Sequence, residues 1–132
     1  MNKLSPNALL EAAAKAHHNA HSKYSKFSVG SALLTEDNSI FLGCNVENAS
    51  YGLTICAERV ALTSAVSVGH KSFQAIAIVA DELAAPCGAC RQVLAEFCED
   101  DFPVYVASAK DSASFETHLL GKLLPERFHF NP

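Results

Sequence analysis

Two short cysteine motifs constrain this chain more than any other feature of its sequence. The first is Cys56-Ala57-Glu58, and the second, later in the chain, is Pro86-Cys87-Gly88-Ala89-Cys90. Two cysteines in a C-x-x-C pattern can bind one metal ion from a single turn of backbone, and Cys56 can add a third thiolate. Three protein ligands on a tetrahedral Zn²⁺ leave one position for water, whereas a structural zinc site is closed by a fourth ligand. The two motifs are therefore predicted to meet at a catalytic zinc site, with one Zn²⁺ per chain.

Glu58 is the candidate catalytic residue beside this site. It lies two residues after Cys56, close enough to exchange protons with a water molecule on the metal without binding the metal. A glutamate at the start of a helix would by default interact with the helix dipole, but its position next to a three-ligand zinc favours acid–base catalysis.

Two other interpretations of the cysteines are weighed. A structural zinc could be completed by Cys44, Cys98 or a histidine, but this leaves Glu58 and Pro86 without a role. A redox-active C-x-x-C pair is the second alternative, and it does not explain the first motif. Cys44 and Cys98 are expected to be small buried residues and not ligands.

Length and charge bound the domain organisation and the partners. A chain of 132 residues is long enough for one compact core and too short for two, so residues 1–132 are predicted to form a single domain. A hydrophobic fraction of 49% and a charged fraction of 18% exclude a disordered or fibrous protein. The formal net charge of -4 argues against a partner held through phosphates, so no nucleic-acid partner is expected.

The sequence contains no segment that is expected to enter a membrane. No apolar run approaches the length of a membrane span, and residues 1–6 lack the apolar core of a signal peptide. Five cysteines cannot all pair within one chain, and a cytosolic C-x-x-C motif is more often metal-binding or redox-active than a disulfide. We therefore expect a cytoplasmic protein with no membrane partner.

The order of periodic segments predicts an α/β fold. Helices are expected at 7–21, 55–68, 87–98 and 119–124, and strands at 28–34, 39–46, 74–80, 103–107 and near Phe115. This order predicts a three-layer α/β/α sandwich around a mixed sheet of about five strands. Both cysteine motifs fall at strand-to-helix junctions, where the positive end of the helix dipole favours thiolates.

Three thiolates on one Zn²⁺ give a net charge of about -1, which weakens the pull of the metal on the electrons of bound water. Arg59 is the nearest cation in sequence. We expect its guanidinium to hydrogen-bond one or more of the cysteine sulfurs and offset their charge. A surface arginine that meets only solvent is the alternative, and Arg91 is a second candidate for the sulfur contact.

Four segments carry a family resemblance. They read Tyr-Ser-Lys-Phe-Ser-Val-Gly at 24–30, Gly-Cys-Asn-Val-Glu-Asn-Ala-Ser-Tyr-Gly at 43–52, Cys-Ala-Glu-Arg at 56–59, and Pro-Cys-Gly-Ala-Cys-Arg-Gln-Val-Leu at 86–94. Together they resemble the short, homotetrameric class of cytidine deaminases, within the zinc-dependent cytidine and deoxycytidylate deaminase superfamily. The resemblance runs from about Tyr24 to Phe128, which is most of the chain.

The resemblance implies an activity. Members of this class deaminate cytidine and deoxycytidine hydrolytically to uridine and deoxyuridine, with release of ammonia, in pyrimidine salvage. It implies that Glu58 takes a proton from the attacking water and then delivers protons to N3 of the base and to the departing amino group. It also implies a nucleoside substrate and a homotetrameric assembly.

The resemblance further implies which residues bind the substrate. Asn45 and Glu47 match the ribose-binding pair, Phe27 matches an aromatic residue packed against the pyrimidine, and the backbone N–H of Ala57 is expected to meet the base carbonyl. The other expected substrate-binding positions are Val46, Asn48, Ala49, Ser50 and Tyr51. Tyr51 and Phe128 also match residues that help close a neighbouring subunit's pocket, with packing in the chain's own core as the alternative.

Three rival functions are less favoured. Deaminases of the antibiotic blasticidin S share Cys-Ala-Glu and the Pro-Cys-x-x-Cys-Arg-Gln pattern, but the block Asn45-Val46-Glu47-Asn48 disfavours them. A polynucleotide-editing deaminase is disfavoured by the acidic balance and small size of the chain. A structural zinc module without catalysis would hold a metal with no exchangeable water.

Overall fold

Residues 4–132 are described by a computed structural model; Met1–Lys3, the start of the segment considered above for a signal peptide, lie outside the described residues. The strands are β1 (Val29–Thr35), β2 (Ile40–Cys44), β3 (Phe73–Ala80), β4 (Pro103–Ser108) and β5 (Asp111–Leu119). They form one sheet in the order β2-β1-β3-β4-β5. The β3–β4 pair is parallel and the other three pairs are antiparallel, so the sheet is mixed.

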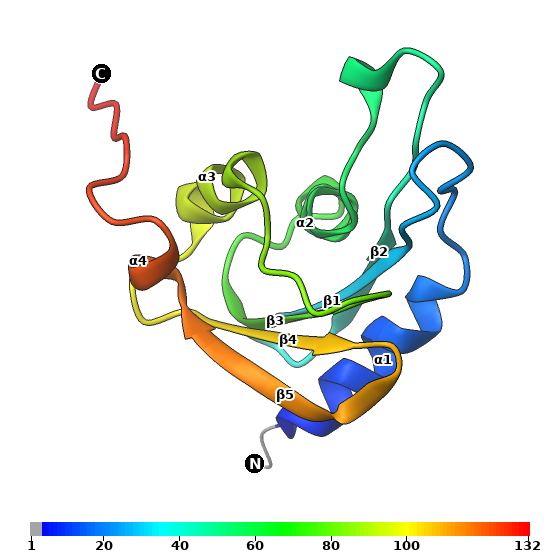
Figure 1. The fold of residues 1–132 in the computed structure, drawn as a ribbon. Helices are drawn as coiled ribbons and strands as arrows, with labels where there is room; N and C mark the ends of the chain where they lie inside the picture. The colour runs from blue at the N-terminus through cyan, green and yellow to red at the C-terminus, as the bar shows by residue number, and fades with distance from the viewer. Residues whose placement is uncertain (1–3) are drawn as a thin grey trace.

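Helices cover both faces of the sheet (Figure 1). Helix α1 (Pro6–His17) packs on one face, and α2 (Ala57–Ser67) and α3 (Gly88–Phe97) pack on the other. The short helix α4 (Leu120–Leu123) follows β5. This arrangement confirms the predicted three-layer α/β/α sandwich around a mixed five-stranded sheet. No helix within residues 4–132 is long and apolar enough to cross a bilayer.

Two apolar cores flank the sheet. Leu62 and Leu94, from α2 and α3, pack with Ile76 on one face. Leu9 and Leu10, from α1, form the core on the other face. Strand β3 contributes to both, and seven of its eight residues are buried. The uninterrupted apolar run of this strand is therefore explained by its burial on both faces.

The ends of several elements differ from the sequence-based expectation. Helix α1 ends at His17 and not at His21, because the His21 N–H donates to Asn45 O and the His21 carbonyl accepts from Glu47 N–H. Residue 55 was expected in the second helix, but Ile55 instead pairs with Val46 in an isolated bridge. Strand β5 is a full edge strand, and the short 3₁₀ helix η1 (Tyr51–Leu53) was not predicted.

Two glycines let helix backbone rest directly on strand backbone. A Cβ at Gly43 of β2 would lie 2.2 Å from Ala57 O and 2.6 Å from Ala61 N of α2. A Cβ at Gly30 of β1 would lie 2.2 Å from Ala13 O of α1. Any larger residue at position 43 would push the first turn of α2, which carries Glu58, away from the sheet.

Candidate active site

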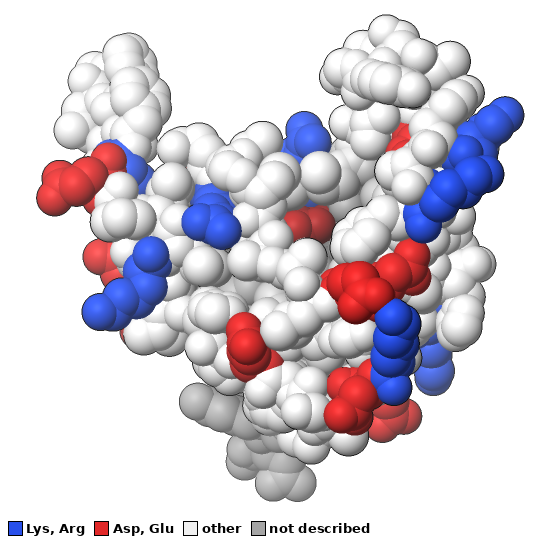
Figure 2. All heavy atoms as spheres, in the orientation of Figure 1, with Lys and Arg blue, Asp and Glu red and all other residues white. Residues whose placement is uncertain are grey.

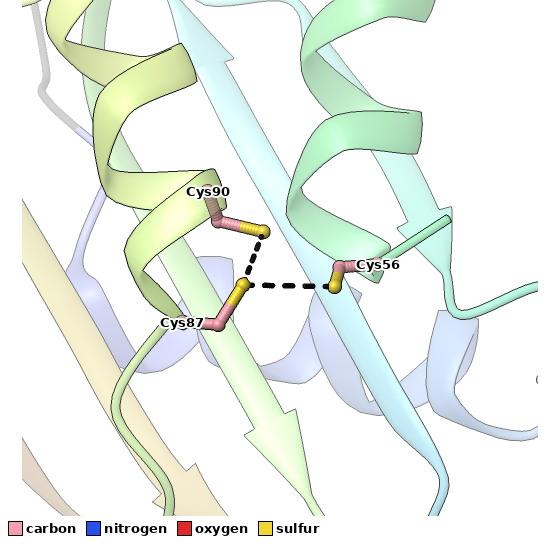
Figure 3. Close-up of side chains that lie close together, drawn as sticks. All are labelled: Cys56, Cys87 and Cys90. Atoms are coloured by element: carbon pink, nitrogen blue, oxygen red, sulfur yellow. Dashed lines mark hydrogen bonds between the residues drawn. The ribbon is translucent and has the colours of Figure 1, made fainter. Parts of the chain in front are cut away.

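Three cysteines converge at the N-termini of two neighbouring helices (Figure 3). Cys56 is the N-cap of α2, Cys87 is the N-cap of α3, and Cys90 lies in the first turn of α3. Cys87 Sγ lies 3.8 Å from Cys56 Sγ and 3.5 Å from Cys90 Sγ, and all three sulfurs lie within 4.8 Å of one another. Two sulfurs bound to one tetrahedral Zn²⁺ are about 3.8 Å apart. The spacing therefore fits one zinc ion.

No fourth ligand joins this group in the described part of the chain. Among residues 4–132, the only cluster of three or more His, Cys, Asp or Glu side chains able to hold a metal contains Cys56, Cys87 and Cys90. Cys98 is buried elsewhere, and burial raises the pKa of its thiol to about 12. The arrangement matches an open zinc site more closely than a closed structural one.

The charge of the sulfurs is offset by Arg59. Its Nη2 donates to Cys56 Sγ at 3.4 Å, while its Nε is buried without a hydrogen-bond partner. A hydrogen bond with Cys90, and then the guanidinium of Arg59, lowers the pKa of the Cys56 thiol to about 5. The hydrogen bond with Cys56, and then burial, raise the pKa of the Cys90 thiol. Cys56 is therefore prepared to bind a cation as a thiolate.

Arg91, the second candidate for the sulfur contact, is engaged elsewhere. Its Nε donates to Pro86 O at 2.7 Å, and its Nη1 donates to Leu123 O at 2.7 Å. The guanidinium thus ties the residue before Cys87 to the end of α4. Arg91 holds the backbone of the second cysteine motif and does not compensate the sulfurs directly.

Glu58 is a buried carboxyl group in the first turn of α2. Only 5% of the residue is exposed. Burial raises the pKa of its carboxyl group to about 7, and the nearby charge of Cys56 acts in the same direction. A group with a pKa near the working pH can both accept and donate a proton, as general acid–base catalysis requires.

A cavity of about 280 Å³ lies in front of this carboxyl group. Its lining includes six residues predicted from the sequence, which are Phe27, Asn45, Glu47, Cys56, Glu58 and Cys87. Sequence reasoning missed the remaining lining residues, which are Ser25, Val29, Thr54, Ile78, Ala80, Ala84 and Ala85. Most of these are small or apolar residues of loops and strand ends, and no local pattern distinguishes them from ordinary packing.

Asn45 and Glu47 have a structural task in addition to their position in the cavity. Asn45 Oδ1 accepts from Val29 N–H, and Asn45 Nδ2 donates to Phe27 O, both at 2.9 Å. Glu47 Oε1 accepts from the N–H groups of Tyr24 and Ser25 at 2.9 and 3.0 Å. Both side chains therefore hold the segment 24–29 that forms one wall of the cavity.

A second hollow of about 390 Å³ adjoins the first. It shares Ser25, Glu47 and Thr54 with the first cavity, and Asn48 and Tyr51 line it as well. Of the other predicted positions, Val46, Ala49 and Ser50 line neither hollow. Ala57 is fully buried, and its N–H is among the first of α2, which have no acceptor within the helix.

Tyr51 and Phe128 are both on the surface, so the core-packing alternative is wrong for each. Tyr51 is 75% exposed and Phe128 is 71% exposed. The segment around η1 and the C-terminal segment rise on the same side of the sheet as α2 and α3, at opposite ends (Figure 1). On the face shown in Figure 2, the tips of these two projections carry no Lys, Arg, Asp or Glu side chains, and the surface is hollowed between them.

Comparison with known proteins identifies the family. Residues 5–106 match the family described as "Cytidine and deoxycytidylate deaminase zinc-binding region". The chain belongs to this deaminase family. It is 50% identical to a cytidine deaminase of Sporosarcina psychrophila over 91% of this chain and 88% of that one. A crystal structure of cytidine deaminase from Burkholderia pseudomallei superposes with a TM-score of 0.89 at 45% identity, covering 95% of this chain and 100% of the other.

The family assignment identifies the metal. The matching family region is a zinc-binding one, and the three cysteines form a cluster that can hold a metal ion, so the cofactor of this deaminase family member is Zn²⁺. A blasticidin-S deaminase of Bacillus cereus is 33% identical over 64% of this chain, a more distant and more partial match.

Proposed function

We propose that this protein is a zinc-dependent deaminase that hydrolyses cytidine and deoxycytidine to uridine and deoxyuridine and releases ammonia. One observation carries the proposal: Glu58, whose carboxyl group is buried, lines one cavity of about 280 Å³ together with Cys56 and Cys87, in a member of the deaminase family. Relatives that match most of the chain are named cytidine deaminases. In a cell this reaction would serve pyrimidine salvage.

The proposed mechanism assigns the metal to Cys56, Cys87 and Cys90, with one Zn²⁺ per chain. When bound there, zinc supplies a Lewis acid that makes water nucleophilic at neutral pH. Glu58 accepts one proton from the water that adds to C4 of the base. It donates that proton to N3, then accepts the second proton of the water from the hydroxyl group on C4 and donates it to the departing amino group, so one carboxyl group acts as base and as acid. Its burial keeps bulk water from exchanging these protons.

The substrate contacts follow from the walls of the cavity. Phe27 provides an apolar face against the pyrimidine, and the Ala57 N–H, at the positive end of α2, is available to the base carbonyl. Asn45 keeps one N–H for a ribose hydroxyl after its two backbone contacts, and Glu47 can accept from another. The remaining residues of the block, Val46, Asn48, Ala49, Ser50 and Tyr51, would surround the sugar.

The charges of the residues that line the two hollows favour a nucleoside substrate over a nucleotide. None of the residues that line the two hollows is Lys or Arg, and Glu47 contributes to both. A 5′-phosphate would therefore meet a carboxylate without a lining cation to pair with it.

Ammonia release decides the proposal. We expect release with cytidine and deoxycytidine, loss of release after chelation, and recovery after addition of Zn²⁺. Cytidine monophosphate and blasticidin S, tested at the same concentration, are expected to react far more slowly. Faster reaction with blasticidin S would favour the antibiotic-deaminase function, and a metal-loaded protein inactive on all of these substrates would favour a structural zinc module.

We further propose a homotetramer that acts in the cytoplasm. The free state of all five cysteines is typical of a reducing compartment. Exposed Tyr51 and Phe128 lie on projections that suit contact with another copy of the chain, since large exposed apolar residues often mark interfaces. The proposed contact lets each of these residues help close a neighbour's pocket.

Dilution is expected to reduce specific activity, because separated subunits would lose the residues that complete each pocket. The measurement pairs light scattering with cytidine assays across one dilution series, with zinc content followed throughout. Tyr51→Ala and Phe128→Ala should move the loss of activity to higher protein concentration. Val68→Ala, a change at another exposed apolar residue directly after α2, should not. A fully active monomer with bound zinc would contradict the shared pockets.

A further inference from the structure

Asp81 lies at the junction between the two walls of the cavity, although it does not line the cavity itself. It follows β3 directly, at the sheet end where Val29 of β1 pairs with Ala80 of β3. One wall is the segment 24–29, which contains Ser28, and the other is formed by Ala84 and Ala85, which follow Asp81 in the chain.

The carboxylate of Asp81 connects three parts of the fold. Its Oδ2 accepts from Ser28 N–H at 2.8 Å, and its Oδ1 lies 2.7 Å from Nε2 of His17 at the end of α1. Its own backbone N–H donates to Ser28 O at 3.1 Å. Ser28 and Asp81 are thus joined in both directions, and the side chain continues the β1–β3 ladder where the strands themselves end.

These contacts complete the support of Phe27. Asn45 holds the backbone on both sides of Ser28 from the β2 side, through Phe27 O and Val29 N–H. Asp81 holds Ser28 from the opposite side, through the β3 end and α1. The backbone at Phe27 and Ser28 is therefore held between two side chains that follow different strands, Asn45 after β2 and Asp81 after β3.

The second wall depends on the same residue. Ser108 Oγ at the end of β4 donates to Asp81 O at 3.2 Å, which fixes the start of the loop that carries Ala84 and Ala85. The pKa of the Asp81 carboxyl group is lowered, first by the Ser28 N–H and then by His17, so the group is ionised at neutral pH. A charged acceptor strengthens both hydrogen bonds.

We infer that Asp81 is a positioning residue that fixes the distance between the Phe27 wall and the Ala84–Ala85 wall, and so determines how tightly the nucleoside base is held. This inference rests on the proposed function. It assigns Asp81 to substrate affinity and not to the chemical step, because the residue contacts neither the cysteines nor Glu58 in the structure.

The test measures KM and kcat for cytidine together with the inhibition constant of uridine, the product. Asp81→Ala is expected to raise the KM for cytidine and the inhibition constant of uridine about tenfold each. The kcat should change less than about twofold. Zinc content should stay at the parental value. Asp81→Asn keeps an oxygen that accepts from Ser28 N–H, and it should restore both constants to within about threefold of the parent.

Glu82→Ala is the matched control. Glu82 is the next residue, is exposed, pairs with Lys110 at 2.5 Å and does not line the cavity, so its removal should leave all constants unchanged. If Asp81→Ala does not accumulate as folded protein, His17→Ala takes its place, with an expected rise in KM of about threefold at constant kcat.

If the parent is active, three results would overturn the inference. The first is a parental KM in Asp81→Ala, and the second is a parental KM in His17→Ala where that variant takes its place. The third is a fall in kcat that follows the loss of folded protein while KM stays constant. A parent that releases no ammonia from cytidine would instead overturn the proposed function, and the two failures are therefore distinguishable.

Discussion

Replacement of Glu58 by Gln should abolish turnover of cytidine and leave about one zinc per chain. The amide keeps the shape of the side chain but cannot carry protons, and proton transfer by a positioned group is worth about 10²–10⁴-fold in rate. The buried site already favours a neutral side chain, since burial raises the pKa of the carboxyl group to about 7, so the melting temperature should not fall. Single-turnover ammonia release and zinc analysis measure both effects.

The control for this variant is Glu96→Gln, the same change at an exposed position of α3. It should retain parental kcat. Near-normal activity of Glu58→Gln would remove Glu58 from the mechanism, and loss of zinc from that variant would indicate that the carboxylate acts on the metal site and not on protons.

Cys87→Ala and Cys90→Ala should each lose zinc, and activity with it. Two remaining thiolates make an incomplete site, and metal binding is coupled to folding of the two helix N-termini. The zinc content should therefore drop from about one per chain to near zero. The proposed ligands also lie side by side, with Cys87 Sγ 3.5 Å from Cys90 Sγ and 3.8 Å from Cys56 Sγ, so each removal leaves only two of the three sulfurs at the site. Metal analysis after gel filtration, with and without a competing chelator, measures the loss.

Cys98→Ala provides the comparison, because Cys98 is a buried cysteine outside the cluster. It should lower stability slightly, by about 1 kcal/mol, and keep zinc and activity. Parental zinc affinity in either Cys87→Ala or Cys90→Ala would show that the proposed ligand set is wrong.

Local sequence predicted the parts of this molecule that depend on local chemistry. The starts of α1, α3 and α4, the turn after β1 and the apolar run of β3 are properties of neighbouring residues, and these helix starts lie within one residue of the expected place. Helix α2 begins at Ala57, two residues later than expected. The meeting of Cys56 with Cys87 was predictable because a metal with few ligands requires it. Cys56 and Cys87 are the N-caps of α2 and α3, as expected from the position of the two motifs at strand-to-helix junctions.

Contacts between distant segments could not be predicted in this way. The bond between Ser28 and Asp81 joins residues 53 positions apart, and neither residue type indicates it. Asn45 was expected only to bind substrate, yet its amide also holds the backbone of the wall that carries Phe27. Arg91 was a candidate partner of sulfur, but its donors reach two carbonyl groups, one of them from α4. These outcomes depend on the order of strands in the sheet.

The close approach of α2 to Gly43 indicates where directed evolution of this enzyme can succeed. Backbone meets backbone there, so the placement of Glu58 does not depend on the size of an intervening side chain. Phe27 and Ala84, by contrast, reach the cavity from loops. Libraries selected on modified pyrimidine drugs should therefore accumulate changes in these loops, while position 43 remains glycine in every active clone.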